Sequence, residues 1–310
     1  MLKVGKPGPA APATEDLKGR ILSFMRGAST EITPSEENRL PELKSVLPAG
    51  TTIYVAHTPK TTFAQVIQAA LAVRRAGLLA APHIAVRRVA DLRTLRSGLA
   101  QLRAGGVEQI LLIAGDAPTP LGELSGTLDV LESHVLEESG ITRIGVAGHP
   151  EGHNAVDTES LWNALIAKQA YALREGVRLH IVTQFGFEGG ALAAWQRELA
   201  ERQILLPVRV GIAGPASAAT LLHFALQCGI GASTRVLMGN FAAAARKLNL
   251  VMTPDQHLLA LSAAPPSEQI IAPHFFAFGG ALQTARWMAK VAAGAFDIDE
   301  KAARFKLHAS

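Results

Sequence analysis

The chain has 310 residues, of which 48% are hydrophobic, with a formal net charge of +4 and one cysteine, Cys228. Such a chain can bury a large core, and its length fits either two average domains or one α/β barrel. A single cysteine excludes an intramolecular disulfide and a cysteine-based metal site. The lysines and arginines are scattered and form no basic run with interleaved aromatic residues, so nucleic acid is not an expected partner.

Residues 1–16 are rich in Pro, Ala and Gly, which predicts a flexible N-terminal tail before a barrel domain formed by residues 17–310. No apolar run reaches the ~18 residues of a membrane span, and the first residues lack the apolar segment of a signal peptide. We therefore expect a cytoplasmic protein without a membrane partner.

Short apolar runs alternate with longer amphipathic stretches, a pattern that predicts βα units and a parallel sheet. No change in composition divides the eight units, which favours one closed (β/α)8 TIM barrel over an open, doubly wound sheet. Apolar spacing predicts helices that include 63–76, 89–102, 161–174 and 191–202, and five glycines are typical helix ends: Gly77, Gly105, Gly140, Gly176 and Gly229. The predicted strands are Ile21–Phe24, Thr52–Ala56, Leu79–Val86, Gln109–Ala114, Arg143–Ala147, Leu179–Gln184, Val208–Ala213 and Ile270–Phe278.

Polar residues recur at or just after the predicted strand ends. The carboxyl ends of barrel strands meet on one face, and that face carries the active site of barrel enzymes. This bias therefore predicts an enzyme with its site at the carboxyl face. In chain order the residues are Glu31, His57, Thr58, His83, Gly115, Asp116, His149, His153, Gln184 and His274.

These residues fit some chemistries better than others. Several histidines at strand ends are also typical of metal-dependent hydrolases, but barrels of that class commonly carry His-x-His on strand one, and this chain has none there. A metal site is therefore not expected. The Gly-rich loops of Rossmann and P-loop nucleotide sites are absent, although a nucleotide can lie across the mouth with a lysine such as Lys168 on its phosphates. What remains is the carboxylate pair Glu31 and Asp116 in an apolar mouth, where low dielectric raises the pKa of a glutamate and suits it to general acid catalysis.

Five segments in order resemble the signature blocks of the methylenetetrahydrofolate reductase family. The resemblance runs from about residue 20 to about residue 295. The blocks are Ala-Ala-Pro-His-Ile (80–84), Ile-Ala-Gly-Asp-Ala-Pro (113–118), Gly-Val-Ala-Gly-His-Pro-Glu-Gly-His (145–153), Ile-Val-Thr-Gln-Phe (181–185) and Pro-His-Phe-Phe-Ala-Phe (273–278).

The resemblance implies a barrel enzyme that binds FAD non-covalently and reduces methylenetetrahydrofolate to methyltetrahydrofolate. It implies Glu31 as the general acid that opens the imidazolidine ring and Asp116 as the charge that stabilises the resulting cation. It also implies folate contacts by Glu31, Asp116, Gln184 and Phe276. The implied FAD contacts are His83, Gly115, Asp116, Ala147, His149, His153, Lys168 and Gln184.

The chain departs from the family pattern at four places. The Phe-Phe-Pro-Pro that follows the family's glutamate is Ile-Thr-Pro-Ser, the Arg-Gly-Asp is Ala-Gly-Asp (114–116), a tyrosine is His149, and Asn-Arg is Gly279-Gly280. These changes leave open an enzyme that runs oxidatively on methyltetrahydrofolate and uses NADH poorly, or a flavin- or folate-binding subunit without turnover. NADH stays open as the electron donor, and the sequence does not decide whether the protein forms a homo-oligomer.

Overall fold

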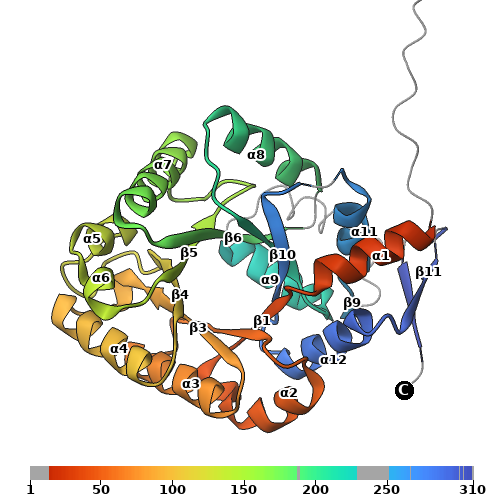
Figure 1. The fold of residues 1–310 in the computed structure, drawn as a ribbon, viewed down its shortest axis with the longest axis horizontal. Coiled ribbons are helices and arrows are strands. Elements are labelled where there is room, and N and C mark those ends of the chain that lie inside the picture. Colours follow the sequence, from red (N-terminus) through yellow and green to blue (C-terminus); the bar gives the residue numbers. More distant parts are fainter. Residues whose placement is uncertain are drawn as a thin grey trace, which may run out of the picture.

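Eight parallel strands form a closed barrel surrounded by helices (Figure 1). This arrangement comes from a computed structural model, which describes residues 14–186, 189–228, 251–265, 267–299, 301–302 and 304–308. Neighbouring strands pair in the order β1-β10-β7-β6-β5-β4-β3-β2, and every barrel pair is parallel. The predicted TIM barrel is therefore confirmed. The barrel strands are β1 (Ser29–Ile32), β2 (Thr52–Val55), β3 (Leu79–Ala85), β4 (Gln109–Ile113), β5 (Arg143–Gly148), β6 (Arg178–Gly186), β7 (Val208–Ala213) and β10 (Ile270–Phe276).

Seven of the predicted strands coincide with barrel strands to within two residues at either end, but the first was wrong. The segment Ile21–Phe24 lies inside helix α1 (Thr14–Met25). Its apolar residues follow helical spacing, since Ile21 and Met25 are one turn apart and both buried. The real first strand is β1, so Glu31 lies within a strand rather than after one.

The helices follow their strands around the outside of the barrel, in the order expected for βα units (Figure 1). Gly105, Gly140 and Gly176 cap three of them, and Gly77 follows a fourth; Gly229 lies outside the described residues. Beyond α1, the described helices are α2 (Leu40–Val46), α3 (Phe63–Arg75), α4 (Leu92–Ala104), α5 (Thr127–Glu132), α6 (Val135–Ser139), α7 (Thr158–Glu175), α8 (Gly189–Glu201), α9 (Ala218–Cys228), α11 (Asp255–Ala263) and α12 (Ala281–Ala292), with short 3-10 turns η1 (Pro34–Arg39) and η2 (Val86–Arg88).

Two small antiparallel pairs accompany the barrel. One joins β8 (Ala216–Ser217) to β9 (Val251–Met252), and the other joins β11 (Phe296–Asp299) to β12 (Arg304–Leu307) near the C-terminus. In the part of the chain that the structure describes, no helix combines the length and apolar character needed to cross a membrane.

Most of the core lies between the barrel wall and the helices, and a second cluster fills the barrel interior. This interior cluster is built on Tyr54, Ala81, Leu111 and Val182 from β2, β3, β4 and β6. The hydroxyl of Tyr54 accepts a hydrogen bond from the Gln109 amide at 3.0 Å. A filled interior is normal for this fold, and it leaves the loops at the carboxyl ends to form the site.

Candidate active site

Glu31 lies at the mouth of the barrel on β1. Side chains alternate along a strand, and Ser29 points into the barrel, where its hydroxyl contacts His274 Nδ1 at 3.0 Å. Glu31, two residues on, therefore points the same way, closer to the mouth. Its Oε1 accepts a hydrogen bond from the Ala277 N–H at 3.2 Å.

The carboxyl of Glu31 is set up to hold a proton near neutral pH. Burial raises its pKa from 4.5 to about 7, although backbone N–H groups of Ala277 and Phe278 oppose the shift, while the nearby charge of Glu36 adds to it. A carboxyl group in this state can donate a proton to a bound molecule. The sequence-based interpretation of Glu31 as a raised-pKa acid agrees with this environment.

Neutral imidazoles form the floor beneath Glu31. His83 and His274 are buried, and both rings pack against Tyr54, with centroid distances of 5.8 and 4.5 Å. Burial lowers the pKa of His83 to about 3 and that of His274 well below its usual value. Their Nε2 atoms are buried and have no hydrogen-bond partner among the described residues.

Asp116 lies at the opposite side of the mouth, after β4, and is exposed. Its carboxylate pairs with the guanidinium of Arg88 of η2 at 2.7 Å. The residue before it, Gly115, has a left-handed backbone with φ of 89°, and a Cβ there would meet the Cβ of Ala85 at 3.0 Å. Glycine is therefore required at this turn, which positions Asp116.

His57 follows β2 and lies near the Asp116–Arg88 pair. The Ala85 N–H donates to His57 Nδ1 at 3.3 Å, so the ring proton belongs on Nε2. Burial, and then the charge of Arg88, lower the pKa of His57 to about 4, with Asp116 opposing the shift. The imidazole is therefore neutral at physiological pH.

The loop after β5 brings His149 and His153 together, with ring centroids 5.3 Å apart. Burial, with the charges of His153 and Lys168, lowers the pKa of His149 to about 3. Ala147 lies two residues earlier on β5, half-buried at the same end of the strand.

Lys168 lies on the buried face of α7, and its side chain is only 7% exposed. Among the described residues its ammonium makes no hydrogen bond and no ion pair. Burial lowers the pKa of this ammonium to about 8. A buried cation without a partner costs several kcal/mol of unfolding free energy, on the order of what a bound anion can return. The position therefore fits a ligand with phosphate or carboxylate groups.

Gln184 and Phe276 lie on the other half of the mouth, on β6 and β10. Phe276 packs against Phe185 at 5.6 Å between centroids, and Phe185 packs against Phe278 at 4.9 Å. Phe276 and Phe278 are only partly buried in this cluster, and Phe278 follows Ala277, whose N–H bonds Glu31. The cluster therefore offers apolar ring surface near Glu31, which suits a planar ring system.

The structure thus brings the predicted residues to one mouth but in separate groups. Glu31, Gln184 and Phe276 lie on β1, β6 and β10, whereas Asp116 and the residues of β5 and α7 lie on the other side. The sequence analysis did not single out Arg87, Arg88 or Glu36, because arginines after a strand and an acidic 3-10 turn resemble ordinary surface.

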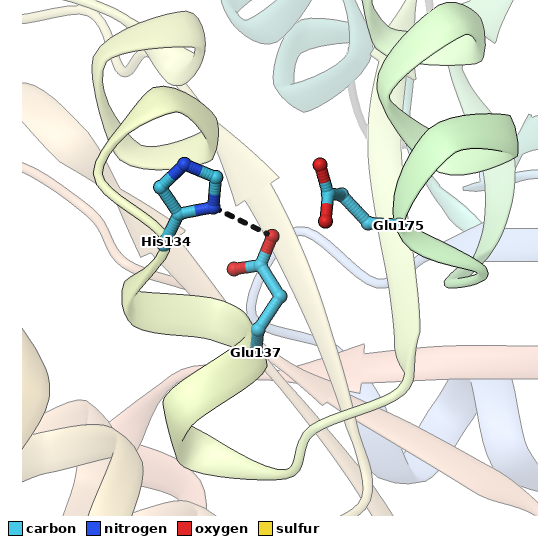
Figure 2. A group of neighbouring side chains, drawn as sticks. All are labelled: His134, Glu137 and Glu175. Atoms are coloured by element: carbon cyan, nitrogen blue, oxygen red, sulfur yellow. Dashed lines mark ion pairs between the residues drawn. The ribbon is translucent and has the colours of Figure 1, made fainter.

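One group of described residues could hold a metal ion, and it is not at the mouth. The ligating atoms of His134, Glu137 and Glu175 lie within 4.8 Å of one another, and Figure 2 shows them converging between two helices. Glu175 ends α7 just before β6 begins, at the amino ends of the strands. This group therefore takes no part in the candidate active site.

The comparison with known families agrees with this geometry. A family model described as methylenetetrahydrofolate reductase matches residues 36–240, which is more than half of the chain. The chain belongs to the methylenetetrahydrofolate reductase family. Membership implies a methylenetetrahydrofolate reductase-type function, that is, an oxidoreductase acting on folate. The matched range contains every predicted site residue except Glu31, His274 and Phe276.

Solved structures with a similar course of the chain are remote. A protein described as a phosphonomutase from Burkholderia cenocepacia has 13% identity and a TM-score of 0.46, over 86% of this chain and 92% of that one. Dihydropteroate synthase from Thermus thermophilus has 16% identity and a TM-score of 0.41, over 84% and 90%. The carboxyl transferase domain of Rhizobium etli pyruvate carboxylase has 11% identity and a TM-score of 0.45, over 100% and 55%. Likenesses this weak support no inference about function.

Proposed function

We propose that this member of the methylenetetrahydrofolate reductase family interconverts 5,10-methylenetetrahydrofolate and 5-methyltetrahydrofolate with non-covalently bound FAD. The observation that carries the proposal is Glu31, a partly buried carboxyl with a pKa of about 7, at the mouth of the barrel. It provides the acid that ring opening of methylenetetrahydrofolate requires. When bound, FAD supplies the hydride-transfer chemistry, which no side chain can provide.

The residues after β4 and β5 fit such a cofactor. Lys168 offers a buried ammonium without a partner to a phosphate, and Gly115 lets the backbone approach a ligand closely. His149 and His153 stand beside them with lowered pKa values, so they can serve as neutral donors or acceptors. Gln184, on β6, is proposed to contact both the cofactor and the pterin.

In the proposed reaction Glu31 gives its proton to the bridging nitrogen of the folate. Because Oε1 already accepts the Ala277 N–H, the proton belongs on Oε2, which is the atom that donates it. The ring opens to an iminium cation, and the carboxylate left on Glu31 stays in place through the same backbone hydrogen bond. Asp116 adds negative charge opposite the cation, and Arg88 fixes its orientation.

A second candidate is the same chemistry run oxidatively, from methyltetrahydrofolate to methylenetetrahydrofolate. Ala114, in place of the family's arginine, and the changed block after Glu31 motivate it, and Gly279-Gly280 stand where the family pattern has side chains used around the nicotinamide or the folate. In that direction Glu31 begins ionised and takes up the proton. At pH values around its pKa of about 7 both forms of Glu31 are populated.

Anaerobic visible spectroscopy of the purified protein tests both candidates. We expect a yellow flavoprotein that methyltetrahydrofolate bleaches. Bleaching by NADH at ordinary affinity would assign the reductive direction. Rapid bleaching by methyltetrahydrofolate, without bleaching by NADH, would assign the oxidative direction. A colourless protein that binds folate without retaining FAD would contradict both and leave a binding subunit.

A further inference from the structure

A cavity beside the mouth carries positive charge that the proposed reaction does not use. It has a volume of about 600 Å³ and lies among the loops after β2, β3 and β4. We call it the arginine cavity. Its polar wall consists of Arg87, Arg88, Thr61, Thr62, Thr94 and Thr119, and no aspartate or glutamate lines it among the described residues.

Arg87 gives the cavity a net positive charge. Its guanidinium donates to the backbone oxygens of Ser125 at 2.7 Å and Ala117 at 3.2 Å, which fix its direction without neutralising it. These two bonds leave three of the five guanidinium N–H groups for a ligand. No carboxylate among the described residues pairs with Arg87, whereas Arg88 is neutralised by Asp116.

Two further groups add donors to the same wall. The Nε of Arg88 is buried and has no hydrogen-bond partner among the described residues. The first two residues of α3, Phe63 and Ala64, line the cavity as well, so the amino end of a 13-residue helix faces it. A fixed guanidinium, threonine hydroxyls and a helix amino end together favour an anion.

The arginine cavity adjoins the residues of the mouth. Ala117, which follows Asp116, lines it, and Arg88 of its wall pairs with Asp116. On the other side the charge of Arg87 contributes to the lowered pKa of His153, in the loop after β5. A ligand bound at the mouth can therefore extend an anionic end into the cavity.

We propose that the arginine cavity is an anion-binding subsite that holds a phosphate or carboxylate group of a ligand bound at the mouth. The proposal rests on the proposed function, which supplies two ligands with such groups: the diphosphate of FAD and the carboxylates of a folate glutamate tail. Arg87 comes from the residues after β3, so it provides a cation beside Ala114, which precedes Gly115 and Asp116 at the mouth. The backbone joins the two places directly, because the Arg87 N–H donates to the Ala114 oxygen at 2.9 Å.

Ala90 offers a way to test the subsite without disturbing its arginines. Its exposed side chain lines the cavity, so Ala90→Glu places a negative charge inside, and Ala90→Gln is a control of the same size. Affinities of the protein stripped of cofactor would be measured by fluorescence for riboflavin and FAD, and by calorimetry for methyltetrahydrofolate with one and with three glutamates. We expect Ala90→Glu, compared with Ala90→Gln, to weaken one charged ligand about tenfold or more, as for loss of a charge-assisted contact.

Selective loss of FAD binding with riboflavin unchanged would assign the subsite to the cofactor's phosphates. Selective loss for the triglutamate would assign it to the folate tail. Equal affinities of the two variants for every ligand would overturn the subsite while leaving the proposed function intact. If the wild-type protein bound neither flavin nor folate, the proposed function would fail, and titration of both variants with inorganic pyrophosphate would then decide on the subsite alone.

Discussion

Glu31 and Lys168 show how single residues at this mouth are tuned by burial. The carboxyl of Glu31 has its pKa raised to about 7, and the ammonium of Lys168 has its pKa lowered to about 8. Loss of water disfavours the charged form of both, so the carboxyl holds its proton more tightly and the ammonium holds its proton less tightly. Both groups therefore change ionisation most easily near neutral pH, where a bound anion or substrate can decide their state.

Glu31→Gln should keep the fold and the flavin but abolish folate turnover. The amide can still accept the Ala277 N–H, yet it can neither give the proton in the reductive direction nor take it up in the oxidative one. Loss of general acid catalysis is typically 10²–10⁴-fold, about 3–5 kcal/mol in the barrier. The measurement is turnover with methyltetrahydrofolate and an artificial acceptor, beside the flavin content from the visible spectrum. Turnover within a few fold of wild type would refute the role of Glu31.

Lys168→Met should loosen the cofactor while stabilising the protein without it. Methionine fills a similar space without a buried charge, so the free energy of unfolding of the cofactor-free protein should rise. Loss of a charge-assisted contact should cost about 1.5–3 kcal/mol in FAD binding, roughly 10- to 100-fold in Kd, with riboflavin affinity unchanged. Denaturant titration and flavin fluorescence measure the two effects. An unchanged affinity for FAD would remove Lys168 from the cofactor site.

At the scale of elements, the carboxylates of β1 and η1 hold the turn that follows β10. Glu31 bonds the N–H of Ala277, and Glu36 bonds the N–H of Ala281, where α12 begins, at 3.2 Å. Between them Phe278 has φ of 51°, an uncommon value for a residue with a side chain. The two bonds therefore tie the ends of the first and last barrel strands together beside the proposed acid.

Glu36→Gln should shift the limb of the reductive pH–rate profile on which Glu31 loses its proton, the alkaline limb, to lower pH. The negative charge of Glu36 helps to raise the pKa of Glu31, so its removal makes Glu31 release its proton more readily. The amide oxygen can keep one backbone bond, which separates loss of charge from loss of the turn. Glu37→Gln, at the exposed neighbouring position, is the matched control and should leave the profile unchanged. Identical profiles for both variants would show that Glu36 does not act on Glu31.

The sequence predicted best those strands that are buried on both faces and therefore appear as continuous apolar runs. Val208–Ala213 was predicted to the residue, because a strand inside the barrel wall reads as a continuous apolar run. The strand β1 was missed because its inward residues, Ser29 and Glu31, are polar and face the site. Helix α4 was predicted to begin three residues early, at residue 89 instead of Leu92. Its start is fixed by Asp91, whose side chain accepts the Thr94 N–H, and the spacing of apolar residues carries no information about such a cap.

The site was predictable as far as strand ends reveal it. Asp116 and Gln184 were singled out because they interrupt or follow apolar runs that are strands, whereas Glu31 was assigned to the end of a strand that is in fact helix α1. The pairing of Asp116 with Arg88 was not, because the partners come from different βα units and only closure of the barrel brings them together. Glu36 was not predicted for the same reason, because the backbone N–H that it binds, that of Ala281, lies far along the chain.

At the scale of the whole molecule, neutral imidazoles are a common feature of the interior. Each has a folded-state pKa lowered mainly by burial, to about 3 or 4 or further, compared with 6.5 in the unfolded chain. The residues are His57, His83, His149, His180, His257 and His274. Because the unfolded chain binds protons there that the folded chain does not, stability is lost as pH falls below 6.5, until the folded-state pKa values are reached.

Unfolding at pH 5.5 should therefore take up protons. On unfolding at this pH the six imidazoles would together bind about five protons. Glu31, which is protonated only in the folded state at that pH, would release about one proton, so the net uptake is about four protons. The free energy of unfolding should fall by about 1.4 kcal/mol per pH unit for each proton taken up, and Glu31 alone works in the opposite sense between pH 4.5 and 7. Denaturant titrations from pH 5 to 7 give this slope. His83→Gln should lower the uptake by about one proton. A slope that corresponds to about one proton or fewer would mean that the interior imidazoles titrate alike in the folded and unfolded chain, and that the floor of the mouth is open to water.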